Sequence, residues 1–360
     1  MSPKSDLFSR LVVGPYVLPN RVFMAPLTRC RADADGSPGP LSAEYYAQRA
    51  SAGLIVAEAT RVRSDSVAYP NTPGIYEPKH ATAWRETTRA VHAKGGRIFL
   101  QLWHVGRVAH PSFTGGTPVG PSAIAAAGTT WTPKGQEPFV LPHAMTEPEI
   151  LEMVDAFRTA GALALEAGFD GVQIHGANGY LVDQFLRDGS NRRTDRWGGS
   201  PENRCRFLLA VVDAVADVWG PARVAVRLSP SGTFNDMRDS DPRTLFAHAV
   251  RELSKRGLAF LEIREAGDDD VRHGADPIPV AFFRPLYAGV LVANTAMTAA
   301  KANGYLAEGV ADAASFGTAF LANPDLPERL RRGAPLNAAD ASTFYTPGPK
   351  GYVDYPALAG

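Results

Sequence analysis

Cysteine is nearly absent from this chain, which has only Cys30 and Cys205 among its 360 residues. This argues against a disulfide scaffold and suits a reducing compartment. Neither charge is in excess, because Lys and Arg together number 37 and Asp and Glu together also number 37. No long-range field thus favours nucleic acid or an anionic membrane, and no apolar run approaches the ~18 residues of a membrane span. We expect a soluble cytoplasmic enzyme for a small molecule, either a monomer or a homodimer, with no bound metal.

The chain does contain eight short apolar runs, and a polar residue ends or follows almost every one. The runs are Val22–Ala25, Leu54–Ala57, Ile98–Leu102, Val172–Ile174, Val224–Leu228, Phe260–Ile263, Val290–Ala293 and Ala313–Phe316. Helical patterns alternate with them, which indicates parallel pairing. Eight parallel strands with polar residues at their C-terminal ends describe a (β/α)8 barrel, whose active site lies at that face. We therefore predict an α/β fold, with a single TIM barrel domain over residues 1–360.

Local signals predict several further elements. A helix is expected over Glu147–Ala167, which has helical apolar spacing and is followed by Gly168. Other helices are expected to start at Ser200-Pro201-Glu202, running to about Val218, at Asp241-Pro242 and at Thr298. The runs Leu11–Val13 and Tyr16–Leu18 flank Gly14-Pro15, which predicts a hairpin at the lower end of the barrel. The Gly- and Pro-rich residues 111–142 predict a long, lid-like loop after the third strand, and residues 342–360 an irregular tail.

The clearest candidate site follows the fourth run, in His175-Gly-Ala-Asn178-Gly-Tyr180. Two side-chain donors three residues apart on one loop can converge on a single oxygen, as in an oxyanion hole. Tyr180 would then supply a proton from the opposite side. For the pair taken alone, a packed histidine and a helix-capping asparagine are the commoner explanation.

Two other polar residues lie inside apolar runs. Arg227 lies near the end of the fifth run, where a cation is poorly solvated and needs an anionic partner, either a carboxylate or a bound cofactor. Gln101 lies in the third run, and a buried amide must find partners for both its donor and its acceptor. A structural partner is as plausible as a ligand for Gln101 alone. Because all of these residues fall at one barrel end, we favour a functional explanation.

The chain resembles the old yellow enzymes over about residues 7–358. The motifs that carry the resemblance are Pro26-Leu-Thr-Arg29, Glu44-Tyr-Tyr-Ala-Gln-Arg-Ala-Ser-Ala-Gly53, Gln101-Leu-Trp-His-Val-Gly-Arg107, His175-Gly-Ala-Asn-Gly-Tyr-Leu181, Asn191-Arg-Arg-Thr-Asp-Arg-Trp-Gly-Gly-Ser200 and Ala322-Asn-Pro-Asp-Leu326. The resemblance implies an FMN-dependent oxidoreductase that takes hydride from NADPH or NADH. Its implied acceptors are activated C=C bonds in enones and maleimides, together with nitro compounds or nitrate esters.

The resemblance also implies roles for individual residues. Those implied for FMN binding are Pro26, Leu27, Thr28, Ala59, Gln101, His175, Arg227, Asn294, Thr295, Phe316, Gly317, Thr318 and Tyr345. Those implied for substrate binding are Tyr69, Trp103, His175, Asn178 and Phe234. His175 and Asn178 would hold the activating oxygen of the substrate. Tyr180 would protonate the α-carbon after flavin N5 delivers hydride to the β-carbon. Each aromatic residue could equally be part of the core.

Two departures from the family affect the phosphate end of the site. Where the family usually places glycines after the seventh strand, this chain has Ala293-Asn-Thr-Ala-Met297. Where an arginine commonly follows Phe-Gly after the eighth strand, this chain has Thr318. We expect weaker or differently arranged phosphate binding, to which the Thr318 hydroxyl can contribute. The alternatives are a flavin-free barrel enzyme, an isomerase or cyclase using the same His/Asn/Tyr site, and a binding protein without turnover. Cys30 is expected to be an ordinary buried thiol.

Overall fold

The structure is a computed structural model, and it describes residues 6–267, 270 and 277–358. Eight parallel strands form a closed barrel in the order β10-β11-β12-β13-β14-β3-β4-β5. Their bounds are β3 (Val22–Met24), β4 (Leu54–Arg61), β5 (Ile98–Trp103), β10 (Gly171–Gly176), β11 (Val224–Leu228), β12 (Phe260–Arg264), β13 (Leu291–Asn294) and β14 (Ala313–Phe316). Each of the eight apolar runs has become one barrel strand, in chain order, so the predicted barrel is confirmed. Residues 1–5, 268–269, 271–276 and 359–360 of the predicted domain lie outside the described part.

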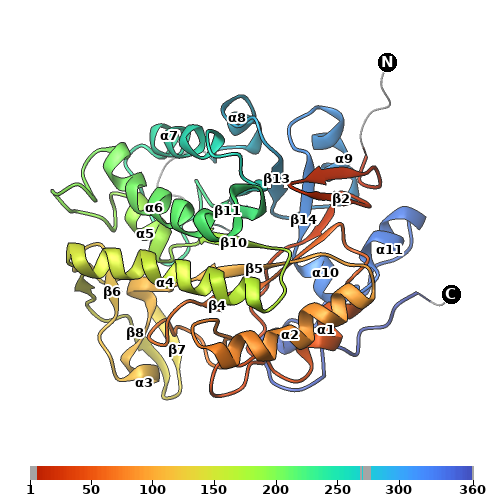
Figure 1. Cartoon of the computed structure of the whole chain (residues 1–360), viewed down its shortest axis with the longest axis horizontal. Coiled ribbons are helices and arrows are strands. Elements are labelled where there is room, and N and C mark those ends of the chain that lie inside the picture. Colours follow the sequence, from red (N-terminus) through yellow and green to blue (C-terminus); the bar gives the residue numbers. More distant parts are fainter. Residues whose placement is uncertain (1–5, 268–269, 271–276, 359–360) are drawn as a thin grey trace.

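Helices lie outside the barrel strands (Figure 1). Their bounds are α1 (Ser42–Gln48), α2 (Pro78–Ala93), α3 (Pro111–Thr114), α4 (Glu147–Glu166), α5 (Leu181–Leu186), α6 (Pro201–Trp219), α7 (Pro242–Ser254), α8 (Val280–Phe283), α9 (Ala299–Ala307), α10 (Thr318–Ala322) and α11 (Leu326–Arg332). The predicted starts are correct: Ser200 accepts from the Asn203 N–H, and Thr298 accepts from the Lys301 N–H. Such caps satisfy N–H groups that have no partner within the helix. Within the described ranges, no helix is both long enough and apolar enough to cross a membrane.

The predicted N-terminal hairpin is present as β1 (Leu11–Val13) and β2 (Tyr16–Leu18). Gly14 is required at its turn, because φ is +51° and an added Cβ would lie 1.9 Å from the Ala222 carbonyl oxygen. One side of the hairpin is buried against Phe23, Phe99 and other residues inside the barrel. The hairpin thus closes one end of the barrel, away from the catalytic-looking residues.

The segment after β5 is more ordered than the predicted loop. It contains α3, the short strands β6 (Val119–Gly120) and β9 (His143–Ala144), and an antiparallel hairpin of β7 (Thr129–Thr132) and β8 (Gly135–Pro138). These strands have few apolar residues, so apolar patterning could not reveal them. The β7/β8 hairpin and the β1/β2 hairpin lie on opposite sides of the molecule (Figure 1). The described part of the tail is irregular, as predicted, apart from a 3₁₀ turn at Ala341–Thr343, and its Tyr352 stacks on Tyr45 of α1.

Candidate active site at the C-terminal end of the barrel

Two cavities meet at the C-terminal ends of the strands. The first, here called the aromatic cavity, has a volume of about 540 Å³ and is lined by Pro26, Leu27, Thr28, Cys30, Tyr69, Pro70, Trp131, Asn178, Tyr180, Phe234, Thr318, Leu321, Phe344 and Tyr345. The second, here called the arginine cavity, has a volume of about 320 Å³ and is lined by Ala25, Pro26, Leu27, Arg227, Arg264, Asn294, Thr295, Ala296, Met297, Ser315, Phe316, Gly317, Thr318 and Ala319. Pro26, Leu27 and Thr318 belong to both linings. The two cavities are therefore neighbours at the barrel mouth.

His175 and Asn178 lie at the end of β10. His175 is buried and pairs in register with Arg227 of β11. Its Nδ1 has no hydrogen-bond partner among the described residues. Asn178 adopts a φ of +59°, which asparagine tolerates better than most residues. Its backbone N–H donates to the Ser229 hydroxyl at 2.8 Å, and its carbonyl accepts from the Asn235 amide at 2.8 Å. These bonds hold the turn, and the Asn178 side chain lines the aromatic cavity.

Burial and the nearby Arg227 guanidinium hold the pKa of His175 well below its ordinary value. Both causes disfavour the imidazolium, so His175 is neutral in the folded protein near pH 7. A neutral imidazole can still donate one hydrogen bond. His175 can therefore polarise an oxygen without bringing a second positive charge beside Arg227.

The lowered pKa of His175 predicts a stability difference below pH 6.5, its ordinary value. In the unfolded chain this histidine gains a proton there, whereas the folded state resists protonation. The contribution of neutral His175 to the free energy of unfolding is therefore fully present above pH 6.5 and is lost as the pH falls below it. Urea unfolding of the wild type and His175→Asn at pH 8, 6.5 and 5 measures the effect. We expect the wild type to lose more stability towards pH 5 than the variant; equal losses would contradict a buried neutral His175.

Tyr180 is buried at the start of α5, and its hydroxyl lies 3.2 Å from that of Tyr69. The rings of His175 and Trp103 meet the Tyr180 ring edge-on, at centroid distances of 4.9 and 5.0 Å. Burial raises the pKa of Tyr180 well above its ordinary value, so the phenol keeps its proton near neutral pH. A protonated hydroxyl at the edge of the aromatic cavity is suited to proton donation.

The predicted substrate-contacting aromatic residues occupy two different layers. Tyr69, Phe234 and Tyr345 line the aromatic cavity, and Phe234 and Tyr345 are about half or more exposed at its mouth. Trp103 is fully buried and stacks on Tyr69, so it supports the cavity wall from behind. Ala59 lies in the same buried cluster and lines neither cavity.

Sequence reasoning missed Trp131, which is 67% exposed and lines the aromatic cavity from the β7/β8 hairpin. Its exposure alternates along β7 with the buried Thr130 and Thr132. The available signal in the sequence was the pair Gly128 and Gly135, which bracket residues 129–134. The lid-like role predicted for this segment thus rests on one hairpin residue at the cavity.

Arg227 and Gln101 both have protein partners. The Arg227 guanidinium donates from Nη2 to Asn294 Oδ1 at 2.7 Å, and its Nε lies 4.0 Å from Glu262 Oε1. Gln101 donates from Nε2 to Gln173 Oε1 at 2.8 Å. Arg227 therefore lies near a carboxylate of the neighbouring strand, but its Nε has no hydrogen-bond partner among the described residues. Gln173 and Glu262 were missed, although each is a polar residue inside an apolar run, the same signal that singled out Gln101 and Arg227.

The two departures from the family meet at the arginine cavity. Thr295 and Ala296 have φ values of +118° and +45°, a region that glycine enters more easily. The Thr295 hydroxyl donates to the Glu265 carbonyl at 2.7 Å, and Lys301 Nζ donates to the Thr295 carbonyl at 3.2 Å. These contacts hold the turn despite the missing glycines. Arg264, which follows the Phe260–Ile263 run and was given no specific role, adds a second guanidinium to the cavity and pairs with Asp270 at 2.9 Å.

Cys30 lines the aromatic cavity but is 2% exposed and forms no disulfide. Burial raises its pKa to about 12, so it remains a thiol. Among the described residues, no group of three or more His, Cys, Asp or Glu side chains could hold a metal ion.

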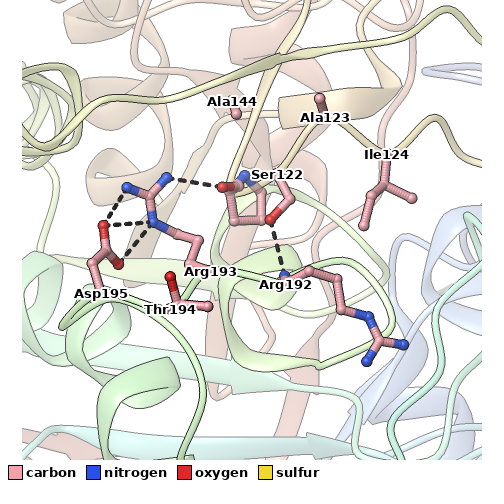
Figure 2. Close-up of a pocket in the computed structure, with 9 residues that line it drawn as sticks. Ser122, Ala123, Ile124, Ala144, Arg192, Arg193, Thr194 and Asp195 are labelled. Carbon is pink, nitrogen blue, oxygen red and sulfur yellow. Dashed lines mark hydrogen bonds and ion pairs between the residues drawn. The ribbon is translucent and has the colours of Figure 1, made fainter.

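A third cavity lies apart from all predicted site residues and is drawn in Figure 2. There the Arg193 guanidinium pairs with Asp195, and the Arg192 N–H donates to the Ser122 hydroxyl (Figure 2). Arg193 also donates to the carbonyls of Pro121 and Met145. The motif Asn191–Ser200 therefore ties the segment after α5 to the chain around β6 and β9.

Comparison with known proteins finds relatives that match nearly the whole chain. A model of the NADH:flavin oxidoreductase / NADH oxidase family matches residues 6–337. A probable flavin mononucleotide-dependent alkene reductase of Leishmania infantum is 44% identical over 355 residues, covering 97% of this chain and 96% of the relative.

Two solved structures share the fold along nearly the whole chain. The old yellow enzyme homologue from Zymomonas mobilis has a TM-score of 0.94 at 44% identity, covering 98% of this chain and 100% of that one. Morphinone reductase in complex with tetrahydroNAD has a TM-score of 0.92 at 45% identity, covering 99% and 98%. This chain therefore belongs to the NADH:flavin oxidoreductase / NADH oxidase family, as an FMN-dependent oxidoreductase of the old yellow enzyme type.

Proposed function

We propose that this protein reduces activated C=C bonds of small molecules, such as enones and maleimides, with hydride from NADPH or NADH. The observation that carries the proposal is the buried, protonated Tyr180 beside His175 and Asn178 at the barrel mouth. Nitro compounds and nitrate esters are proposed as further acceptors. We also propose that the whole chain acts as one domain in the cytoplasm, as a monomer or homodimer, without nucleic acid.

The residues at the barrel mouth fit FMN. Arg227 Nε is buried without a hydrogen-bond partner among the described residues, and it needs an acceptor. Arg227 and Gln101 would hold the polar edge of the pyrimidine ring, and Thr28 the neighbouring carbonyl. The arginine cavity would take the phosphate, with donors from the Thr295 turn, Gly317 and Thr318. When bound, FMN supplies the hydride that it receives from NAD(P)H.

His175 and Asn178 would bind the oxygen that activates the substrate double bond. Donors aimed at a site where negative charge develops stabilise the transition state more than the ground state. The neutral state of His175 suits this role, because the imidazole can donate a hydrogen bond without placing a second positive charge beside Arg227.

Tyr180 would place a proton on the α-carbon. Its hydroxyl is held by Tyr69, and Trp103 packs behind both rings. The buried Tyr180 hydroxyl lines the aromatic cavity and keeps its proton near neutral pH, so the phenol would be the donor on this side.

An anaerobic titration tests the proposed function. The purified protein should be yellow, NADPH or NADH should bleach its flavin absorbance, and an enone or maleimide should restore it. Recovery by a nitrate ester would extend the acceptor range. A flavin-free preparation that fails to take up added FMN, or a reduced flavin that no enone reoxidises, would overturn the proposal.

Tyr180→Phe separates proton donation from hydride transfer. The variant keeps the ring and loses only the hydroxyl, so flavin reduction by NAD(P)H should be nearly unchanged. Enone reduction should slow by about 10²–10⁴-fold, the usual contribution of a positioned acid. Rapid-mixing absorbance of each half-reaction measures both rates. Reduction of nitrate esters needs no proton on carbon and serves as the internal control; equal slowing of all three reactions would show that Tyr180 only shapes the cavity.

A further inference from the structure

One carboxylate, that of Glu262 in β12, sits among the polar side chains inside the barrel. It is 1% exposed and accepts hydrogen bonds from two different directions. Gln173 donates from Nε2 to its Oε2 at 2.7 Å, and the Ser315 hydroxyl donates to its Oε1 at 2.6 Å. The two bonds begin two chains of hydrogen bonds, which end at Gln101 and at Arg227.

In the first chain, which runs from Glu262 through Gln173 to Gln101, only one assignment of donors and acceptors is consistent. An ionised carboxylate accepts hydrogen bonds and donates none, so Gln173 must turn its NH₂ group towards Glu262. The side-chain oxygen of Gln173 then faces Gln101. Gln101 must therefore donate from its own NH₂ group, and its Nε2 lies 2.8 Å from Gln173 Oε1. Gln101 Oε1 accepts no hydrogen bond from the described residues. Glu262 thus determines that Gln101 offers an acceptor to the site.

The second chain reaches the same carboxylate, but its direction is also fixed by the Ser315 backbone carbonyl, which accepts from Asn294 Nδ2 at 3.1 Å. Because the Ser315 hydroxyl gives its proton to Glu262, its lone pairs face Asn294, which donates from Nδ2 at 2.9 Å. Asn294 therefore turns Oδ1 towards Arg227, whose Nη2 donates to it at 2.7 Å. In both chains the side chains are 7% exposed or less, so water does not readily replace a misdirected group.

We propose that Glu262 is a positioning residue that, through Gln173, sets the donor and acceptor directions of Gln101, and through Gln101 the recognition of the FMN pyrimidine ring. The proposal rests on the proposed function, since it concerns the same FMN site. The imide of that ring has an N–H donor at N3, which matches the free acceptor of Gln101. Arg227 is held at the other end by Asn294.

Glu262→Gln tests the proposal with a change of one group. A glutamine has a single oxygen, so it cannot accept from both Gln173 and Ser315 in the way that a carboxylate does. Asn294 stays fixed between Arg227 and the Ser315 carbonyl, to which its Nδ2 also donates at 3.1 Å. The Ser315 hydroxyl therefore still donates to position 262, so the new NH₂ group faces Gln173 and the first chain reverses. Gln101 then turns its NH₂ group outwards, which places a donor where the site needs an acceptor.

The readout is the choice between FMN and N3-methyl-FMN, which lacks the N3 donor. Full-length holoprotein is equilibrated with a mixture of the two, and the bound ratio is measured after release. The wild type should prefer FMN, and Glu262→Gln should reduce that preference by about tenfold, as expected for one misdirected hydrogen bond. Steric effects of the methyl group cancel in the comparison of the two proteins.

Two further variants complete the test. Gln173→Met interrupts only the first chain and should lower the preference for FMN as Glu262→Gln does, which decides the matter if Glu262→Gln fails to fold. Glu265→Gln is the matched control, because Glu265 directly follows β12 but contacts Lys301 and Tyr305 outside both chains; its preference should equal that of the wild type. An unchanged preference in folded Glu262→Gln, or in Gln173→Met, would overturn the proposal. Absence of flavin from the wild type would instead overturn the proposed function.

Discussion

Arg227→Leu should release FMN and destabilise the folded protein by about 3–5 kcal/mol, the usual cost of removing one partner from a buried ion pair. Arg227 and Glu262 are 6% and 1% exposed, so the remaining carboxylate would be left uncompensated. The variant also removes the donor that Asn294 Oδ1 accepts. Flavin content after purification and urea unfolding measure the two effects.

Arg264→Leu is the control for the loss of Arg227. It removes a cation from the same cavity, but one that is 25% exposed and pairs with Asp270. Its removal should cost only about 0–1 kcal/mol, as for partly solvated pairs. A double variant, Arg227→Leu with Glu262→Leu, should recover part of the lost stability, because no charge is then buried without a partner. Retained flavin and a stability loss no larger than that of Arg264→Leu would contradict the role of Arg227.

Loss of either His175 or Asn178 should slow enone reduction by about 10²–10³-fold, equivalent to ~2.7–4 kcal/mol for one donor of an oxyanion hole. His175→Ala removes the imidazole donor. At position 178 the suitable variant is Asn178→Gly, because the φ of +59° would strain an alanine. Phenols should also bind more weakly to both variants, since a phenolate resembles an enolate.

The perturbation of the flavin absorbance by added phenols gives the dissociation constants, and single-turnover rates give the kinetics. Trp103→Phe is the control, because Trp103 lies behind the cavity wall and contacts the substrate site only through Tyr69 and Tyr180. It should change phenol binding much less than either donor variant. If both donor variants bind phenols as tightly as the wild type, His175 and Asn178 do not hold the substrate oxygen.

The barrel could be predicted from the sequence because its signals are local. Parallel strands covered by helices are buried on both sides and read as short apolar runs, such as Val224–Leu228. Ser200 and Thr298 mark helix starts by capping N–H groups within the same turn. His175, Asn178 and Tyr180 are close in the chain, so their meeting at one strand end follows from the barrel itself.

Other features depend on contacts between residues far apart in the chain. The proposed role of Glu262 depends on its hydrogen bonds with Gln173, 89 positions away in the chain, and Ser315, 53 positions away. Strand register decides which polar side chains meet inside the barrel, and no single strand encodes it. Trp103 follows the same rule: its motif placed it near the site, but packing against Tyr69 and Tyr180 put it behind the wall.

The sequence by itself determined the fold and the face that carries the site, because periodicity and capping act over a few residues, whereas most of the residues that line the site were implied by the resemblance to the old yellow enzymes. Only the tertiary structure decided that Trp131 reaches the aromatic cavity and that Arg264 shares the arginine cavity with Arg227. It also decided the directions of the Gln173 and Gln101 amides inside the barrel. Those directions follow from a buried carboxylate that can only accept, and its partners become neighbours only when the barrel closes.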